Sequence, residues 1–540
     1  MPRLLLRVVA LAGVLLAWLP LVSARASDYV PVSGAGSTWS QNALDQWRRN
    51  VNQYGLTVNY QGTGSSDGRN QYRNGTVDFA VSEIPYGLTD GGVSDDPPKR
   101  QYAYMPIVAG GTSFMYNLTI GGKRVTNLRL SGENLTKLFT GVITQWNDWA
   151  LQADNPSLAL PARRVVPVVR SDGSGTTAQF TRWMSKEYQS LWDSYCSKAG
   201  RQTPCGTTSN YPVIQGRGFT AQSGSLGVAG YTSQAQSDGA ITYVEYSYAL
   251  NTGFPVAKLL NKAGYYTSPT ASNVAVALLK NRIDTNASSP SYLTSILDDV
   301  YENPDPRTYP VSSYSYMIVP TAVESNFSDS KGKSLGAFAY YFLCEGQQQA
   351  PVLGYSPLPI NLVQAGLDQV RRIPGVDVQS VDIKKCNNPT FSGDGTNTLA
   401  KNAPQPSPCD KQGATQCSAG TGGAPNTPTP HSTQGGSTPN VTGPTLSGAA
   451  VPSGHGSTPG STAVTSGTAG AAPAGGAPAG PAGVVTGSAA SVVAVPVSLA
   501  APTGQGLRHL LMLLTVLLVL SSVVLPPLLG RRLAAGKGET

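Results

Sequence analysis

A long stretch of low complexity limits what this chain can fold into. Across residues 394–505, Gly, Pro, Ser, Thr and Ala dominate, and aromatic residues are almost absent. A segment of this composition buries too little apolar surface to offset the entropy lost on ordering. We therefore expect residues 394–505 to form a disordered linker, which leaves residues 28–393 as the folded part. As a flexible coil of about 110 residues, the linker would average about 60 Å from end to end.

The first residues have the pattern of a signal peptide. Arg3 and Arg7 precede an apolar run, which leads to the small-x-small sequence Ala-Arg-Ala at 24–26. This order is typical of a secretory signal that is cleaved after the small residues. We predict a signal peptide at residues 1–26, with a retained membrane anchor as the alternative.

A second apolar run, residues 510–529, has a length that matches the hydrocarbon core of a bilayer. It is followed by Arg531, Arg532 and Lys537, and positive charge beside a span favours the cytoplasmic side. We predict a transmembrane helix at 510–529 and a cytoplasmic tail at 530–540. The folded part would then be extracellular, on a single-pass protein of the cell membrane.

The cysteine count indicates disulfide bonds. Six cysteines occur in a chain that carries an export signal, and exported proteins keep their disulfides. Proximity favours three pairs, although the sequence leaves the connectivity open: Cys196 with Cys205, Cys344 with Cys386, and Cys409 with Cys417. No CxxC pair is present, so a redox or zinc-binding motif is not indicated.

Histidine is absent from the predicted folded part. The three histidines of the chain are His431, His455 and His509. Their positions exclude Ser-His and Cys-His nucleophilic catalysis, and histidine-ligated metal sites, from residues 28–393. No GxxxxGK[ST] loop for nucleotide phosphates occurs either. We therefore predict that the folded part is not an enzyme and uses neither a metal nor another cofactor.

The charge balance favours an anionic partner. The formal net charge is +8, which suits an anionic ligand or an anionic cell surface. Nucleic-acid binding would require a clustered basic stripe, and the sequence has none. We therefore expect no nucleic acid among the partners.

Helical and strand patterns alternate along the folded part. Apolar side chains recur at every fourth position, on one face of a predicted helix, at Trp39, Ala43, Trp47 and Val51. A β-branched run at 165–169 is typical of a buried strand. The alternation predicts an α/β fold with βαβ crossovers. About 365 residues are too many for one compact core, so we expect two lobes.

Four clusters of small polar residues are the candidates for ligand binding. Two of them, GAGSTW at 34–39 and RSDGSGTT at 170–177, follow a predicted strand and start a predicted helix. Free N–H groups and partial positive charge at a helix start, joined by hydroxyls, make an anion site. Each cluster alone also fits an ordinary helix N-cap. The other two clusters are GTGSSDG at 62–68 and TVDFAVSEIP at 76–85.

These clusters, in this order, resemble the motifs of the phosphate-specific substrate-binding proteins of ABC importers, the PstS family. The family patterns are GAG[AS]T with a following aromatic residue, NYQGxGSxxG, TVDFxxSDxP and RxDGSGT. This chain has GAGSTW, NYQGTGSSDG, TVDFAVSEIP and RSDGSGT at the corresponding places. The resemblance spans about residues 29–375, nearly the whole predicted folded part.

The resemblance implies a periplasmic-binding-protein fold of type II, with a ligand cleft between two lobes. Lobe 1 would comprise residues 28–108 and 310–393, and lobe 2 residues 109–309. Two hinge crossovers would join the lobes, near 107–111 and near 309–311. Closure about these crossovers would bury the ligand and exclude water from its hydrogen bonds.

The resemblance also implies a phosphate site, position by position. Arg170 would supply the one formal positive charge and a forked hydrogen bond, and Asp172 would orient it. Glu83 falls at the position of the acidic residue in the family. The remaining ligands would be hydrogen-bond donors: Thr38, Trp39 through its backbone N–H, Ser65, Ser174, Gly175 and Thr176.

Glu83 departs from the family, in which this position is normally Asp. A carboxylate only accepts hydrogen bonds, so it favours an oxyanion that carries a proton, such as phosphate, over sulfate. Glu keeps the acceptor but is one methylene longer. We expect retained phosphate binding, with weaker binding or a different oxyanion as the alternatives.

The predicted function is therefore the capture of inorganic phosphate outside the cell for an ABC importer, with the closed form docking on the ABC permease. A second hypothesis is a tethered surface binding protein or sensor that does not feed a transporter, since the long linker suits it. A third is a hydrolase that uses carboxylates such as Asp78 and Glu83. Turnover of a phosphate ester would identify the third.

Overall fold

A computed structural model describes residues 29–90, 93–286, 288–289, 291–376, 383 and 386–425. The predicted signal peptide, transmembrane helix and cytoplasmic tail lie outside these residues, as does the linker beyond 425. Among the described residues, no helix combines the length and the apolar character that a membrane crossing requires.

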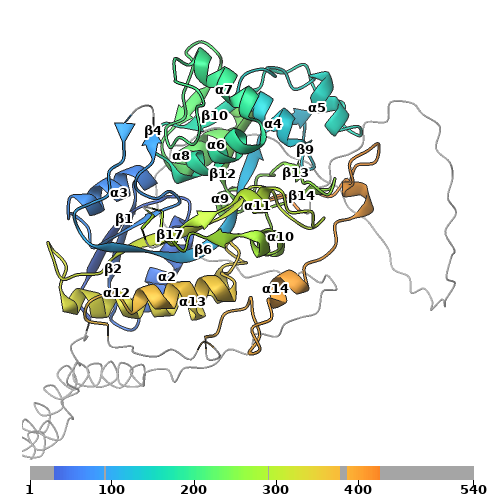
Figure 1. Ribbon diagram of the computed structural model, residues 1–540. Helices are drawn as coiled ribbons and strands as arrows, with labels where there is room; N and C mark the ends of the chain where they lie inside the picture. The colour runs from blue at the N-terminus through green and yellow to red at the C-terminus, as the bar shows by residue number, and fades with distance from the viewer. Residues whose placement is uncertain are drawn as a thin grey trace, which may run out of the picture. The chain divides into compact units, whose positions relative to one another are not determined.

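An eight-stranded mixed sheet forms the centre of the fold (Figure 1). Its strand order is β11-β10-β12-β6-β17-β3-β1-β2. The strands are β1 (Val32–Gly36), β2 (Val58–Gly62), β3 (Phe79–Ser82), β6 (Tyr102–Tyr116), β10 (Val166–Arg170), β11 (Thr220–Gln222), β12 (Ala240–Glu245) and β17 (Ser312–Pro320).

Strand β6 runs through both lobes. From Tyr102 to Gly111 it pairs antiparallel with β17, and from Thr112 to Tyr116 it pairs antiparallel with β12. Beyond β17, strands β3, β1 and β2 complete lobe 1; beyond β12, strands β10 and β11 complete lobe 2. At the change of partner, the Thr112 N–H donates to the Val311 carbonyl at 2.9 Å. The predicted two-lobed α/β fold is confirmed.

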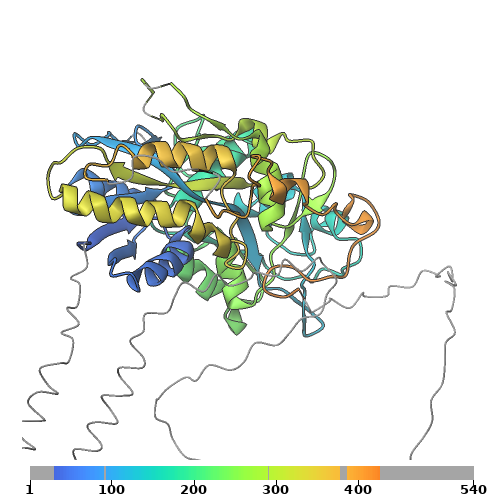
Figure 2. The same cartoon turned by 90° about the horizontal axis from the view of Figure 1, so that it is seen from below.

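Helices follow the parallel strands directly. They are α2 (Gln41–Asn52) after β1, α3 (Ser65–Arg73) after β2, α6 (Gly175–Glu187) after β10, α8 (Gly224–Thr232) after β11 and α9 (Tyr246–Thr252) after β12. Helix α2 buries Ala43, Leu44, Trp47 and Val51, as the fourfold spacing predicts. In lobe 1, α12 (Asp329–Leu343) and α13 (Ile360–Val370) lie side by side and cover one face of the sheet (Figure 2).

Shorter elements complete the described part. The helices are α4 (Gly132–Phe139), α5 (Trp149–Asp154), α7 (Gln189–Lys198), α10 (Ala271–Ala277), α11 (Asp298–Tyr301) and α14 (Thr398–Lys401). The strands are β4 (Thr89–Asp90), β5 (Val93–Ser94), β7 (Thr119–Ile120), β8 (Lys123–Arg124), β9 (Arg129–Leu130), β13 (Lys258–Leu260), β14 (Tyr266–Thr267), β15 (Arg282–Ile283) and β16 (Ser295–Ile296). Four single turns of 3-10 helix lie at Ala235–Ser237, Leu278–Lys280, Glu345–Gln349 and Pro408–Asp410.

The three disulfides join the pairs that proximity favours: Cys196–Cys205, Cys344–Cys386 and Cys409–Cys417. Their Cα atoms are 6.1, 4.8 and 5.0 Å apart, within the range that a disulfide spans. No free cysteine remains among the described residues. The connectivity that the sequence left open is thus the local one.

The C-terminal segment, residues 386–425, corrects the expected start of the linker at 394. It is drawn in orange in Figure 1 and continues from the Cys344–Cys386 disulfide at the end of α12. In lobe 2, Arg129 donates to the Thr415 carbonyl at 2.7 Å and Lys258 pairs with Asp410 at 2.6 Å. The segment contributes few apolar side chains, and hydrogen bonds and two disulfides hold it instead. Composition therefore did not reveal that it is folded.

Candidate functional site

The predicted polar clusters lie at the carboxyl ends of parallel strands. Ser37 and Thr38 follow β1, Glu83 follows β3, and Arg170 ends β10. In open α/β sheets, ligand sites form beyond the carboxyl ends of the strands. The carboxyl ends of β1 and β3 in lobe 1 lie near that of β10 in lobe 2. Hydrogen bonds join residues of the two lobes there, between Thr38 and Ser225 and between Ser65 and Gly175.

Glu83 is the centre of one hydrogen-bonded group. Its Oε1 accepts from Ser37 Oγ at 2.6 Å and from Ser315 Oγ at 2.7 Å, and its Oε2 accepts from Ser65 Oγ at 2.8 Å. Glu83 is only 1% exposed. Burial raises the pKa of the Glu83 carboxyl, and the three hydroxyl donors and the charge of Arg170 oppose that rise.

Ser65 connects this group to lobe 2. Its Oγ accepts a hydrogen bond from the backbone N–H of Gly175, the first residue of α6, at 3.2 Å. A Cβ atom at Gly175 would lie 1.8 Å from Glu83 Oε2, so glycine is required for the carboxylate to reach the start of α6. The single hydroxyl proton of Ser65 is donated to Glu83. A bound anion would compete with Glu83 for it.

Arg170 belongs to a second group, in which Ser225 is central. The Arg170 guanidinium is 3% exposed or less and makes a forked pair with Asp172, with 2.7 Å between Nε and Oδ1. Its Nη1 donates to Ser225 Oγ at 3.3 Å. Ser225 Oγ is 2.8 Å from Thr38 Oγ1 in the other lobe, and the Ser225 N–H donates to Thr38 Oγ1 at 3.2 Å.

The pairing with Arg170 fixes the charge state of Asp172. Burial raises the pKa of the Asp172 carboxyl, but the hydrogen bonds and the charge of Arg170 outweigh it, so the pKa lies below the usual value. Asp172 Oδ1 also accepts from the Gly224 N–H at 2.9 Å. Asp172 therefore remains an anion that orients Arg170 and the start of α8.

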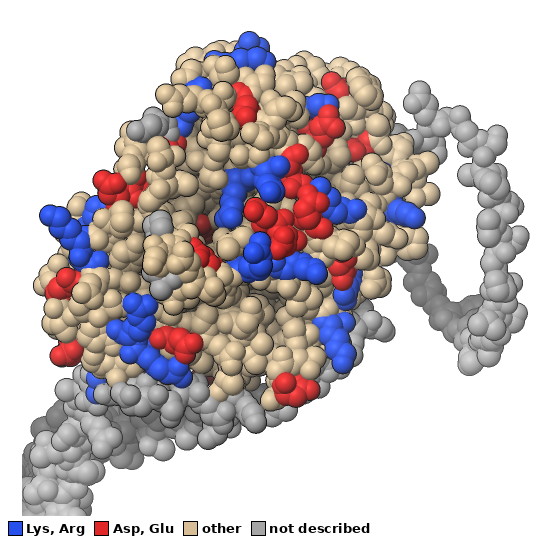
Figure 3. Space-filling model, in the orientation of Figure 1, with Lys and Arg blue, Asp and Glu red and all other residues tan. Residues whose placement is uncertain are grey.

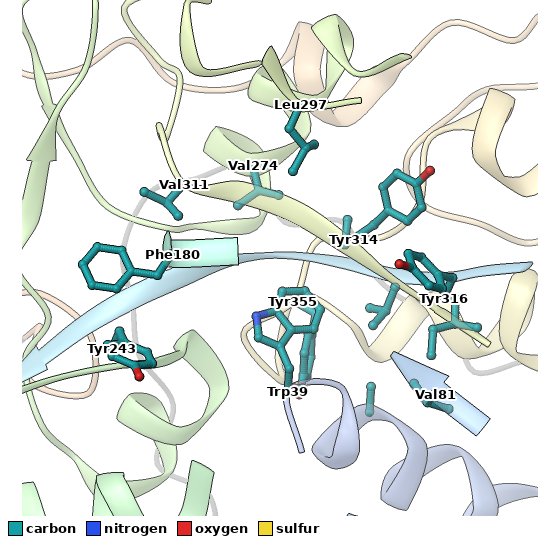
Figure 4. Close-up of a cluster of buried hydrophobic side chains, with 14 of the residues drawn as sticks. Trp39, Val81, Phe180, Tyr243, Val274, Leu297, Val311, Tyr314, Tyr316 and Tyr355 are labelled. Carbon is teal, nitrogen blue, oxygen red and sulfur yellow. The ribbon is translucent and has the colours of Figure 1, made fainter. Parts of the chain in front are cut away.

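Trp39 contributes its backbone rather than its ring. Its N–H donates to Ser37 Oγ at 3.0 Å. The indole ring packs edge-on against Tyr355 with 5.8 Å between ring centroids, inside the buried cluster in Figure 4. The backbone N–H of Trp39, which was predicted to bind the ligand, is thus present at the site but already donates to Ser37.

Ser174 and Thr176 lie at the start of α6. Ser174 Oγ accepts from the Thr177 N–H at 3.2 Å, so Ser174 is the N-cap of the helix. Thr176 Oγ1 is buried and has no hydrogen-bond partner in the described part of the chain. The first N–H groups of any helix lack intrahelical partners. This end of α6 therefore has donor capacity for an anion.

The sequence analysis missed three serines of the site. Ser37 lies within the quoted GAGSTW cluster, between the glycines and Thr38. Ser225 had a usable signal, because Gly224 and Ser225 follow a strand and start a helix as the recognised clusters do. Ser315 lies inside β17 and had no local signal, since its position depends on the pairing of distant strands.

Asp90 makes a further contact between the lobes. It accepts in lobe 2 from Thr208 Oγ1 at 2.5 Å, Ser209 N at 2.8 Å, Ser209 Oγ at 3.0 Å and Asn210 Nδ2 at 3.1 Å, and pairs with Arg201 at 2.8 Å. Burial raises the pKa of the Asp90 carboxyl, but these bonds outweigh it and the pKa lies below the usual value. The two lobes are therefore in a closed arrangement.

A cavity of about 230 Å³ adjoins Glu83 and is also lined by Gln179, Arg182 and Tyr316. Pockets for drug-sized ligands measure roughly 300–1,000 Å³, so this space suits a smaller ligand or ordered water. On the face in Figure 3, basic and acidic side chains lie close together rather than in a field of one sign. On this face, attraction for an anion would therefore come from the buried Arg170 more than from the surface charges.

Comparisons with known proteins give consistent matches. The sequence profile described as PBP superfamily domain matches residues 22–345. Phosphate-binding protein PstS of Xylella fastidiosa is 32% identical over 343 residues, 63% of this chain and 85% of that protein. Phosphate-binding protein PstS of Pasteurella multocida is 30% identical over 343 residues, 62% of this chain and 88% of that protein. A solved high affinity periplasmic phosphate-binding protein, bound with phosphate, superposes with a TM-score of 0.48 at 17% identity, covering 65% of this chain and 100% of that one.

Proposed function

Because the chain belongs to the PstS family of phosphate-binding proteins, we propose that its two lobes capture inorganic phosphate outside the cell for an ABC importer. One observation carries the proposal: Arg170, hydroxyl groups from both lobes and the Glu83 carboxylate converge in one buried place. A guanidinium and hydroxyl donors suit the oxygens of phosphate, and a carboxylate acceptor suits its proton.

The proposed ligands are the residues that the family motifs indicate, with Ser225 added. They are Thr38, Trp39, Ser65, Glu83, Arg170, Ser174, Gly175, Thr176 and Ser225, and Asp172 orients Arg170. Several of these donors now bond to one another, so phosphate would exchange existing hydrogen bonds for new ones. A neutral hydrogen bond contributes only about 0.5–1.5 kcal/mol net. We therefore assign the largest single share of the affinity to the charge of Arg170.

Binding would require the lobes to separate and close again. Strand β6 and the connection at 309–311 are two of the places where the chain passes between the lobes, and a rotation there would open the site. The C-terminal segment is a third, since it bonds to lobe 1 through Thr390 and to lobe 2 through Arg129. Closure would return Thr38 and Ser65 of lobe 1 to Arg170 and the start of α6. The closed form would then dock on the ABC permease.

The folded part would be held outside the membrane by its tether. Three disulfides suit an oxidising compartment. Signal peptide 1–26 would direct export, and the helix at 510–529 would anchor the chain in the membrane. Because the C-terminal segment is folded to residue 425, the linker would be shorter than the 394–505 expected from composition.

We further propose that the chain binds phosphate without chemical turnover. The hydrolase hypothesis uses carboxylates such as Asp78 and Glu83, but Asp78 has a structural role. Its Oδ1 pairs with Lys331 at 2.8 Å, and its Oδ2 accepts from the backbone N–H of Ser33 at 2.8 Å. Purified protein incubated with a phosphate monoester should release no phosphate.

Calorimetric titration tests the proposed site. The purified chain should bind inorganic phosphate, and Arg170→Ala should lower the affinity at least about 100-fold, because it removes the charged donor and leaves Asp172 unpaired. Arg217→Ala, at an exposed arginine, is the matched control. Unchanged affinity in the Arg170 variant would remove the site assignment. Phosphate uptake by membranes with and without the chain would separate import from sensing.

A further inference from the structure

We propose that Ser37 and Ser315 are positioning residues that hold Glu83 as an acceptor toward the ligand and thereby decide which oxyanions the site takes. This inference rests on the proposed phosphate site and adds to it the pair of residues that set its selectivity.

The two oxygens of Glu83 have different surroundings. Oε1 accepts from Ser37 at 2.6 Å and from Ser315 at 2.7 Å, which occupies both of its in-plane acceptor positions. In the part of the chain that the structure describes, Oε2 accepts only from Ser65, at 2.8 Å, and lies at the start of α6. Oε2 is therefore the oxygen that retains an acceptor position on the side where the anion would lie.

The donor direction of Ser37 is fixed by its neighbour. A serine hydroxyl has one proton to donate. Because the Trp39 N–H donates to Ser37 Oγ at 3.0 Å, that oxygen acts as the acceptor toward Trp39 and gives its proton to Glu83. The first turn after β1 thus aims one donor at the carboxylate.

The donor direction of Ser315 follows from distances and from the sheet. Ser315 Oγ is 2.7 Å from Glu83 Oε1 and 3.2 Å from Ser40 Oγ, so its proton belongs to the shorter, charge-assisted bond. The β6–β17 register shifts between Ser315 and Tyr316. Such irregularities re-aim side chains at functional sites. Here the next residue, Tyr316, pairs with Ser82, which directly precedes Glu83.

Hydroxyl donors to a carboxylate favour its ionised form, and burial favours its protonated form. With both serines present, Glu83 offers an acceptor, which pairs with an oxyanion that still carries a proton. Without them, burial would raise the pKa of Glu83 further, and the protonated carboxyl would offer a donor instead. A donor at this place suits sulfate, which carries no proton.

The other titratable groups that face Glu83 do not compensate for this change. Tyr60 and Tyr316 are buried, and burial raises their pKa values well above 10.0, so both stay neutral. Burial also raises the pKa of Glu245, on β12, well above 4.5. Arg170, the cation whose charge lowers the pKa of Glu83, is already paired with Asp172. Arg182 lines the adjoining cavity and donates to the Ser295 carbonyl at 3.2 Å.

The test is calorimetric titration of the full chain with phosphate and with sulfate, at about pH 8 and about pH 6. In Ser37→Ala, Ser315→Ala and the double variant, the ratio of phosphate to sulfate affinity should fall by about tenfold or more, the value of one charge-assisted hydrogen bond. Sulfate binding should strengthen as the pH falls. Ser315→Thr, which restores the hydroxyl, should recover the parent ratio, and Ser334→Ala, at a buried serine of α12, should not change it.

Glu83→Gln provides a second, independent measurement. Its amide cannot ionise, and sulfate does not titrate between pH 6 and pH 8, so the pH dependence of sulfate binding should disappear. At each pH, adding Ser37→Ala should have no further effect on the ratio. Serine variants that keep the parent ratio at both pH values, or that lose both anions equally, would overturn the inference and leave the phosphate site standing. A parent chain that binds no phosphate would instead overturn the proposed function.

Discussion

The Asp90 carboxylate of lobe 1 accepts a hydrogen bond from the backbone N–H of Ser209 in lobe 2, with 2.8 Å between Oδ2 and N. Asp90 lies on the short β4–β5 hairpin and is also paired with Arg201. None of its partners belongs to the proposed phosphate ligands. The contact therefore stabilises the closed arrangement by itself, and it links the affinity for phosphate to the population of closed molecules.

Asp90→Asn should weaken phosphate binding without touching the ligand site. The apparent dissociation constant equals the intrinsic constant divided by the closed fraction. The loss of the charged hydrogen bonds should lower that fraction, and we expect affinity to fall about tenfold, equivalent to about 1.4 kcal/mol. Calorimetry measures the affinity, and small-angle scattering of the phosphate-free protein should show a larger radius. Asp67→Asn, at an exposed aspartate of α3, should do neither.

The pH dependence of this contact has a defined sign. The pKa of Asp90 lies below its usual value, because the hydrogen bonds outweigh burial. The contact therefore stabilises the closed form fully above the pKa that Asp90 has in the open form. This stabilisation is lost as the pH falls through the lower pKa of Asp90 in the closed form. Scattering should show the same radius at pH 6 and pH 8, with opening only in acid. Opening on the alkaline side would contradict the assignment.

Gly175→Ala should damage the site, and Glu83→Asp should partly repair it. The new Cβ would lie 1.8 Å from Glu83 Oε2 and 2.5 Å from Ser65 Oγ. We expect Gly175→Ala alone to cost about 1–3 kcal/mol of unfolding free energy through this overlap and to weaken phosphate binding. The shorter aspartate withdraws the carboxylate by about one bond. A double-mutant cycle by denaturant unfolding should show a favourable coupling, and additive effects would contradict the observed approach of Glu83 to α6.

The sequence was informative where structure depends on neighbours along the chain. The fourfold spacing in α2, the local disulfides and the clusters at strand ends were all predictable, because each depends on residues within one or two elements. The ligand roles of Glu83 and Arg170 come instead from the resemblance to the PstS family, and they stay predictions. The four motifs that resemble the PstS family then fixed the arrangement of lobes that periodicity alone left open.

The parts that escaped prediction depend on distant pairings. Ser315 reaches Glu83 through the register of β17 with β3 and β6, which no local pattern encodes. The spacing of Leu135, Leu138, Phe139 and Val142 predicts a helix face that includes Val142. The helix ends earlier, since α4 stops at Phe139 and Gly141 adopts a left-handed φ of 66°, which leaves Val142 exposed. The C-terminal segment escaped because its hydrogen bonds are made to residues such as Arg129, more than two hundred positions earlier.

Glu245→Gln should change how stability depends on pH. Burial raises the pKa of Glu245 well above 4.5, and its Oε1 has no hydrogen-bond partner among the described residues. Its contribution to stability is fully present below the unfolded pKa and is lost as the pH rises toward the folded pKa. The glutamine amide does not ionise, so the variant does not lose this stability as the pH rises. Denaturant unfolding should therefore show that the unfolding free energy of the variant rises relative to that of the parent from pH 5 to pH 8. A constant difference between the two would mean that Glu245 does not titrate in this range.

Arg129→Met should release the C-terminal segment from lobe 2. The buried guanidinium donates to the carbonyls of Thr415, Cys409 and Gly413 at 2.7, 3.3 and 3.4 Å. Methionine keeps the apolar contacts of the side chain but leaves these carbonyls without their donor, which should cost about 2 kcal/mol of unfolding free energy. The loosened backbone should become a substrate for trypsin.

Limited proteolysis gives the direct measurement of this release. Lys401 and Lys411 are exposed residues of the C-terminal segment, so trypsin should cleave there faster in Arg129→Met than in the parent. Arg217→Ala should leave the cleavage rate unchanged. The segment is bonded to both lobes, through Thr390 to the Leu358 carbonyl at 2.6 Å and through Arg129. If cleavage is equally slow in the variant, the segment is held on lobe 2 by contacts such as the Lys258–Asp410 pair rather than by Arg129.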